Sequence, residues 1–186
     1  MPYWAHIREF FRCTQRLSYL LSQGYHRCDV AILYPVAAVE AGMGGDEAVQ
    51  AAFNLGNHLF HQGIDFDFID FESLARAKVQ QKELQVSGEA YRVLVLPAMR
   101  AVRHSTIQKA AEFCRAGGMV VGLGPLPEAS DRVGRGDAEL DALVKETFGV
   151  AAKEAAALRE VRVRRNAAGG HGVVAQKPEQ GEAAIG

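Results

Sequence analysis

Apolar residues recur along the chain in blocks that alternate between the spacing of a strand and that of a helix. Short strand-like runs cover residues 30–34, 64–71, 92–97 and 119–121, and the first is apolar on both faces, as central parallel strands are. Helical spacing predicts helices between and beyond them, over residues 46–62, 72–78, 105–116 and 137–148. Asp46 and Ser105 are the expected N-caps. A further helix is expected over 4–23, where Gly24 ends it.

Strands that alternate with helices predict an α/β fold: a mostly parallel sheet with helices on both faces. Right-handed crossovers then give a flavodoxin-like three-layer sandwich with strand order 2-1-3-4. The run 64–71 is expected at an edge of the sheet, because Asp65 and Asp67 alternate with phenylalanines.

The remaining segments carry weaker signals. Residues 36–45 are expected to be a loop, and residues 79–91 an exposed hairpin or irregular loop. The stretches "LREVRVRRN" and "HGVVAQ" could form a C-terminal β-hairpin, and "KPEQGEAAIG" is expected to be disordered. The predicted organisation is therefore an N-terminal linker helix over 1–28, a flavodoxin-like domain over 29–150 and a C-terminal extension over 151–186.

Charge and hydropathy exclude several classes of partner. The formal net charge is -1, so no basic field favours nucleic acid or an anionic membrane. No apolar run approaches the roughly 18 residues that span a bilayer. The start "MPYWAHIREFF" lacks an apolar signal region, so no secretion signal is expected in this chain, and the compartment stays open.

The cysteines are expected to be structural. Cys13, Cys28 and Cys114 are odd in number and share no metal-type spacing. Cys114 precedes a strand, in the last turn of a predicted helix, whereas a nucleophile elbow places its residue just after a strand.

No other group makes a convincing catalytic or metal centre. Asp65, Asp67 and Asp70 could bind a metal, but alternation with phenylalanine is more typical of a half-exposed strand. His58 and His61 lie three apart on a helix without a third ligand. No catalytic residue, cofactor or metal is therefore expected.

A ligand cleft would lie over the carboxyl ends of the strands, as in other open α/β sheets. Tyr34, Glu40, Pro97 and Gly124 are the candidate residues there. An alternative hypothesis follows: a stand-alone small-ligand binder or hydrolase with Glu40 as its general base.

The ordered segments "FRCTQRLSYLLSQGYHRCDVAILYP", "GIDFDFID", "YRVLVLPAM" and "AAEFCRAGGMVVGLGPLPEAS" resemble large glycosidases of family 106, related to the α-L-rhamnosidases. The likeness covers about residues 4–132. The same layout is similar to the trimerisation domain of family 42 β-galactosidases and, through it, to class I glutamine amidotransferases.

The resemblance implies a non-catalytic domain. It places Gly124 where an amidotransferase has its nucleophilic cysteine. The His-x-Glu pair of those enzymes is also missing, because His171 is followed by Gly172 and Val173. The glycosidase carboxylates lie on a barrel that needs roughly 200 residues or more, with a repeat that is absent here. The expected protein is a fragment of a larger enzyme, an accessory or structural domain whose partner is the catalytic barrel of the parent chain. Exposed Trp4, Phe10 and Phe11 would then also promote self-association.

Overall fold

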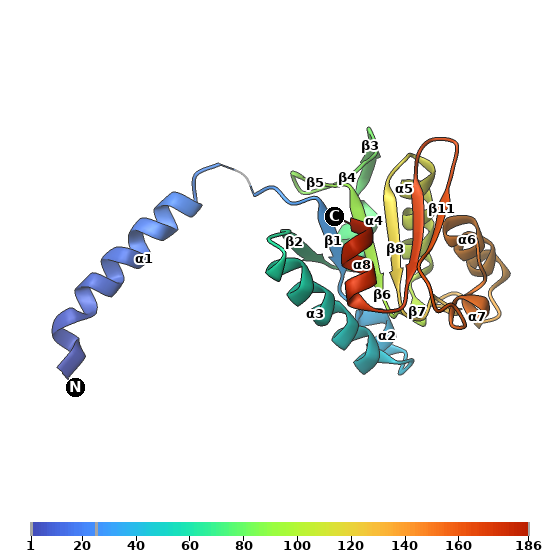
Figure 1. The fold of residues 1–186 in the computed structure, drawn as a ribbon, viewed down its shortest axis with the longest axis horizontal. Helices are drawn as coiled ribbons and strands as arrows, with labels where there is room; N and C mark the ends of the chain where they lie inside the picture. The colour runs from blue at the N-terminus through green and yellow to red at the C-terminus, as the bar shows by residue number, and fades with distance from the viewer. Residues whose placement is uncertain (1, 25, 186) are drawn as a thin grey trace.

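A six-stranded sheet forms the centre of the fold in the computed structural model, which describes residues 2–24 and 26–185 (Figure 1). Its order is β11-β12-β8-β6-β1-β2. The strands are β1 (Val30–Leu33), β2 (Phe66–Ile69), β6 (Val93–Pro97), β8 (Met119–Leu123), β11 (Arg162–Arg165) and β12 (His171–Ala175). The part β2-β1-β6-β8 is parallel and has the predicted order 2-1-3-4, with β2 at the edge. The fold-class prediction is confirmed.

The predicted C-terminal hairpin forms and extends this sheet. β11 and β12 are antiparallel to each other, and β12 runs parallel to β8, with His171 opposite Met119. The chain therefore adds two strands beyond the fourth predicted one.

Helices cover both faces of the sheet, as the apolar runs require (Figure 1). On one face α3 (Gly45–His61) packs Leu55 and Leu59 against Val30, Ile32 and Val95. The opposite face is covered by α4 (Phe71–Arg76), α5 (His104–Arg115) and α6 (Ala138–Phe148). Each face buries its own apolar cluster, which is why the central strands are buried throughout.

Helix starts differ from the sequence prediction at two places. Asp46 and Ser105 lie inside the first turns, and the N-caps are Gly44, at φ 72°, and Arg103. Gly44 has no side chain to cap with, and the Arg103 side chain makes no capping bond. At α5 a distant carboxylate substitutes for the local cap, because Asp131 Oδ1 accepts from the His104 N–H at 2.7 Å.

Two segments expected to be irregular are helical. Residues of the predicted loop form α2 (Val36–Glu40), and the predicted disordered tail forms α8 (Pro178–Ile185). The Gln180 side chain accepts from the N–H groups of Gln176 and Lys177 at the start of α8. Ile185 packs on the α3 side of the sheet. This contact stabilises a helix that the composition of the segment did not suggest.

Short elements complete the body, as we call the α/β part of the chain from β1 to α8. The predicted exposed hairpin is a three-stranded antiparallel sheet of β3 (Lys78–Gln80), β4 (Glu83–Val86) and β5 (Glu89–Tyr91). A second small sheet joins β7 (Ala101–Val102), β9 (Ala129–Ser130) and β10 (Gly134–Arg135), and α7 (Ala152–Ala155) follows α6.

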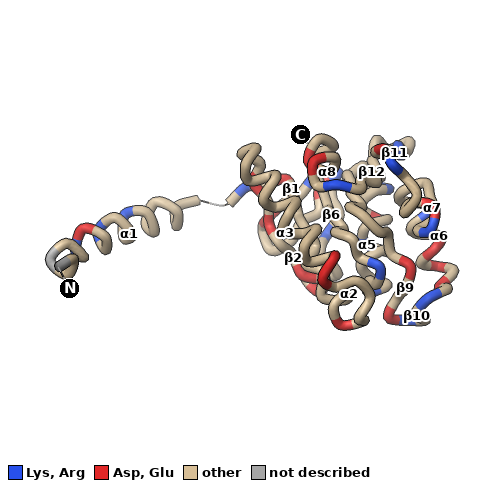
Figure 2. The backbone as a smooth tube through the Cα atoms, turned by 60° about the horizontal axis from the view of Figure 1, so that its bottom comes forward, with Lys and Arg blue, Asp and Glu red and all other residues tan. Residues whose placement is uncertain are grey.

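The N-terminal helix stands apart from the body (Figure 1). A 3₁₀ turn, Pro2–His6, leads into α1 (Ile7–Leu21), which contains no buried residue. None of the described helices is long and apolar enough to cross a lipid bilayer. Lys and Arg are interspersed with Asp and Glu over the α/β part of the chain (Figure 2).

Candidate functional site

The carboxyl edge of the sheet holds the four residues predicted from the sequence. Pro97 ends β6 opposite Leu123, so Gly124, the next residue after β8, lies close to it. Gly124 has φ 75° and its N–H donates to the Ala175 carbonyl at 2.7 Å. Tyr34 instead packs edge-to-face against Phe53, on α3. The structure therefore brings Pro97 and Gly124 together and gives Tyr34 aromatic neighbours.

Glu40 lines a small cavity of about 270 Å³ together with Arg103 and Asp131. Arg103 lies 2.9 Å from the Glu40 carboxylate and 3.8 Å from that of Asp131. Its guanidinium also lies over the ring of Phe71, 5.0 Å from the centroid. A general base at Glu40 would have to give up this ion pair before it could take a proton.

The cysteine nearest to Gly124 in sequence lies at the amino edge of the sheet. Cys114 is buried in the last turn of α5, before β8 begins, whereas Gly124 follows the end of β8. Burial raises the pKa of the Cys114 thiol, which makes it a poor nucleophile. Gly124 itself offers no side chain for chemistry.

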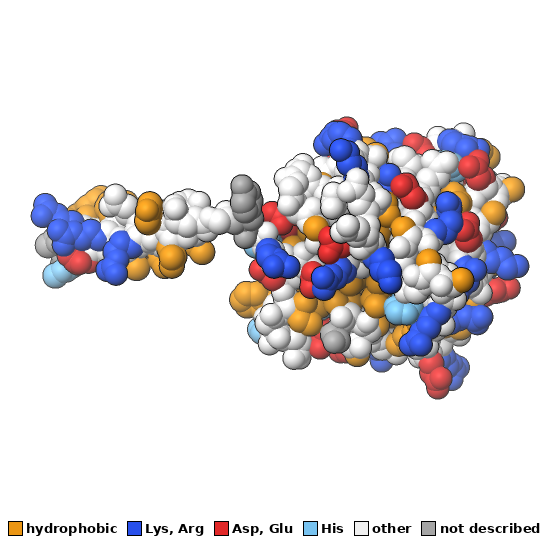
Figure 3. Space-filling view, turned by 90° about the horizontal axis from the view of Figure 1, so that it is seen from above, with side chains coloured by type: hydrophobic (Ala, Val, Ile, Leu, Met, Phe, Trp, Pro, Cys, Tyr) orange, Lys and Arg blue, Asp and Glu red, His pale blue; other side chains and the backbone are white. Residues whose placement is uncertain are grey.

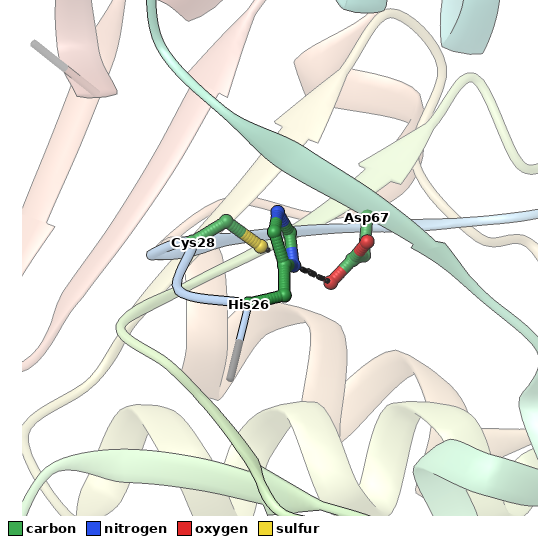
Figure 4. A group of neighbouring side chains, drawn as sticks. All are labelled: His26, Cys28 and Asp67. Carbon is green, nitrogen blue, oxygen red and sulfur yellow. Dashed lines mark hydrogen bonds and ion pairs between the residues drawn. The ribbon is translucent and has the colours of Figure 1, made fainter. Parts of the chain in front are cut away.

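A group of side chains with metal-binding chemistry lies at the amino edge of the sheet (Figure 4). His26 and Cys28 precede β1, and Asp67 is the second residue of the neighbouring strand β2. One potential ligand atom from each of the three lies within 4.8 Å of the others, the only such group of three among residues 2–24 and 26–185.

Hydrogen bonds within this group meet at one carboxylate oxygen. Asp67 Oδ2 accepts from the Cys28 thiol at 3.2 Å and from the Tyr91 hydroxyl at 2.9 Å. It also lies 3.4 Å from His26 Nδ1. The other ring nitrogen, Nε2, lies 2.9 Å from Asp65 Oδ2.

The surroundings of the group raise the pKa values of Cys28, Tyr91 and His26 and so favour their protonated forms. Burial, reinforced by the hydrogen bond to Asp67, raises the pKa of Cys28 to about 12. The same two causes raise the pKa of Tyr91. The hydrogen bond to Asp65 raises the pKa of His26. Without a cation the Cys28 thiol is thus a hydrogen-bond donor at neutral pH, unsuited to nucleophilic attack.

Sequence reasoning missed this group because it compared cysteines only with cysteines and aspartates only with aspartates. Cys28 was expected to be structural, Asp67 to lie on a half-exposed strand, and His26 was not singled out. The available signal was His-x-Cys just before one strand and Asp-x-Asp at the start of the next. Parallel pairing of Ala31 with Asp67 joins the two patterns.

The N-terminal 3₁₀ turn and α1 expose many large apolar side chains (Figure 3). Trp4, Phe10 and Phe11 are 62%, 65% and 60% exposed, which confirms the exposure predicted for them. The other large apolar side chains exposed on this segment are Tyr3, Leu17, Tyr19, Leu20 and Leu21.

Similarity to known proteins identifies the family of the chain. No protein of curated function matches the chain. A solved structure, Gan42B, a GH42 beta-galactosidase, is similar at 17% sequence identity and a TM-score of 0.46, over 81% of this chain and 21% of that one. The chain thus spans about a fifth of that enzyme's length. The sequence model of the family described as alpha-L-rhamnosidase matches residues 2–175, from the first turn to the end of β12. The chain belongs to glycoside hydrolase family 106, the α-L-rhamnosidase family.

Proposed function

We propose that this chain is a non-catalytic accessory domain of a family 106 glycoside hydrolase, and that α1 attaches it to the catalytic portion of the enzyme. In this account the body is an amidotransferase-like fold without a nucleophile at Gly124. Hydrolysis of the glycosidic bond belongs to carboxylates elsewhere in the enzyme.

The exposed apolar side of α1 carries the proposal. Residues that share one side of a helix recur every three or four positions. Phe10, Leu17 and Leu21 follow this spacing, and Arg8, Arg12 and Arg16 recur at four-residue spacing on the other side. A helix with one apolar side normally buries that side against another surface. Here no residue of the helix is buried.

The geometry of the body agrees with a non-catalytic role. Glycosidases use two carboxyl groups that flank the scissile bond, one as acid and one as base or nucleophile. The carboxylates that line the cavity at the carboxyl edge, Glu40 and Asp131, both face the Arg103 guanidinium.

Binding to a separately produced catalytic portion of a family 106 enzyme tests the proposal. The wild-type chain should bind, and Trp4→Ser combined with Phe11→Ser should weaken binding at least tenfold, because each change removes apolar contact area. Phe60→Ser is the matched control, since Phe60 is 74% exposed on α3. Absence of binding, or equal loss in the control, would contradict the proposed attachment.

A further inference from the structure

We propose that His26 Nδ1, Cys28 Sγ and Asp67 Oδ2 form a Zn²⁺ site that fixes the segment leaving α1 to the edge of the sheet. The site is independent of the proposed attachment through α1. It lies at the amino ends of β1 and β2, away from the carboxyl edge where ligands of this fold class are expected.

The spacing of the ligand atoms is close to that of a tetrahedral ion. Zinc bonds of about 2.0–2.1 Å to nitrogen, 2.0–2.2 Å to oxygen and 2.3 Å to sulfur place tetrahedral ligands roughly 3.3–3.6 Å apart. Asp67 Oδ2 lies 3.4 Å from His26 Nδ1, within this range, and 3.2 Å from Cys28 Sγ, slightly below it. All three ligand atoms lie within 4.8 Å of one another. Small side-chain movements would therefore admit the ion.

The surrounding hydrogen bonds orient the ligands as in zinc proteins. A ligating histidine usually donates its other ring N–H to a carboxylate, a backbone carbonyl or water. His26 Nε2 has such a partner in Asp65 Oδ2, at 2.9 Å, and this leaves the Nδ1 lone pair for a metal. The Tyr91 hydroxyl in turn donates to Asp67 and holds that carboxylate in place.

When the His26 ring is neutral, a cation also resolves an electrostatic conflict. With the neutral ring donating through Nε2, the Nδ1 lone pair faces the Asp67 carboxylate oxygen with no proton between them. Zn²⁺ between the two atoms turns this repulsion into coordination. Protonation of the ring would resolve it too, and the two cases differ in whether the isolated chain binds metal.

The donor set selects the metal class. Imidazole with thiolate suits Zn²⁺, whereas Mg²⁺ and Ca²⁺ prefer oxygen ligands. On binding, the Cys28 S–H bond breaks, its proton passes to water, and a zinc–sulfur bond forms. The fourth position is available to water, because the His26 side chain is 44% exposed.

The placement gives the site a structural consequence. His26 and Cys28 lie in the segment that joins α1 to β1, and Asp67 belongs to β2. A shared ion would fix the last residues of this segment on the sheet and so restrict the directions in which α1 can leave the body (Figure 1).

Metal titration of the full chain, freed of metal with a chelator, tests the site. Calorimetry in mildly alkaline buffer should show one Zn²⁺ per chain. Co²⁺ as a probe should give a thiolate-to-cobalt charge-transfer band. Asp65→Asn and Tyr91→Phe, which alter supporting hydrogen bonds, should each lower the Zn²⁺ affinity roughly 10- to 100-fold. Absence of Zn²⁺ binding would overturn the proposal.

Variants of the ligands identify the site. Cys28→Ser should abolish the cobalt band, whereas Cys13→Ser, at an exposed thiol of α1, should leave it intact. His26→Ala should weaken Zn²⁺ binding more than 100-fold and, at an exposed position, keep the far-ultraviolet circular dichroism spectrum. A band that survives Cys28→Ser, is lost in Cys13→Ser, or persists in folded His26→Ala would overturn the proposal.

Limited proteolysis gives a second readout. The exposed Arg27 lies between two of the ligands, so Zn²⁺ should slow tryptic cleavage after Arg27. Cleavage after Arg16 in α1 should be unchanged and serves as the internal control. Equal cleavage rates after Arg27 with and without Zn²⁺ would contradict the proposal that the ion fixes this segment to the sheet.

Discussion

At the scale of single residues, Asp67 links several elements of the fold. One of its oxygens accepts hydrogen bonds from Cys28, just before β1, and from Tyr91, at the end of β5. The same carboxylate belongs to the edge strand β2. It therefore joins the main sheet, the small three-stranded sheet and the segment that leads in from α1.

Asp70 belongs to the same acidic stretch and has a different task. It N-caps α4, where its carboxylate accepts from the Ser73 N–H at 2.8 Å and from the Ser73 hydroxyl at 2.6 Å. These bonds, the hydroxyl one foremost, hold the pKa of Asp70 below its ordinary value of 3.8. The group considered as a metal ligand in the sequence is a helix cap.

Asp70→Ala should lower the free energy of unfolding by about 1 kcal/mol at neutral pH, the usual cost of a lost N-cap. Because the folded pKa lies below 3.8, this stabilisation is present above that pH and is lost as pH falls through the folded pKa. Urea unfolding across pH should show the wild-type advantage shrinking in acid. Asp70→Asn, which keeps an acceptor, should retain most of the advantage. A wild-type advantage that stays constant into strong acid would contradict the assignment.

At the scale of elements, β12 determines whether the C-terminal region is part of the fold. Its residues Val173, Val174 and Ala175 are buried between the helix layers. A Cβ atom at Gly172 would overlap the carbonyl oxygen of Thr147, at the end of α6. Close approach of strand and helix therefore requires glycine at this position.

Gly172→Ala should destabilise the whole body by about 1–3 kcal/mol, the typical cost of overpacking. Denaturant unfolding followed by circular dichroism measures this change. Val163→Ala on the outer strand β11 is the control, because Val163 is 50% exposed and should change stability by less than about 0.5 kcal/mol. An unchanged midpoint in Gly172→Ala would show that β12 is not an integral strand.

How much of the architecture the sequence could predict depends on the strength of local patterns. The central strands and α3, α5 and α6 have clear apolar spacing, so their order and layers could be predicted. α2 and α8 could not, because their residues are small or polar and their helical form depends on contacts such as that of Ile185 with the sheet.

The group at the amino edge could not be predicted for a different reason. His26 and Cys28 lie about forty positions from Asp67 along the chain, and only the parallel register of β1 and β2 brings them together. Register is a tertiary property, which single-residue preferences do not determine.

At the scale of the whole molecule, the contrast lies between a well-packed body and an exposed helix. The body buries an apolar cluster on each face of the sheet, whereas α1 buries nothing. Large exposed apolar patches are typical of interaction sites and of surfaces prone to association.

The isolated chain should therefore associate with itself as its concentration rises. Sedimentation velocity should show the mean mass increasing with concentration. Trp4→Ser combined with Phe11→Ser should shift this transition to higher concentration without loss of helical signal from the body, since both side chains are exposed. A monodisperse monomer at all concentrations would argue against self-association through α1.

Hydrolysis of an α-L-rhamnoside by the purified chain is the most direct test of the central claim, that this family 106 domain is non-catalytic. With p-nitrophenyl α-L-rhamnoside as substrate, we predict no release of nitrophenol above the buffer rate. Glu40→Gln, which alters the acid facing Arg103, should behave identically. Turnover by the wild-type chain that Glu40→Gln abolishes would contradict the account.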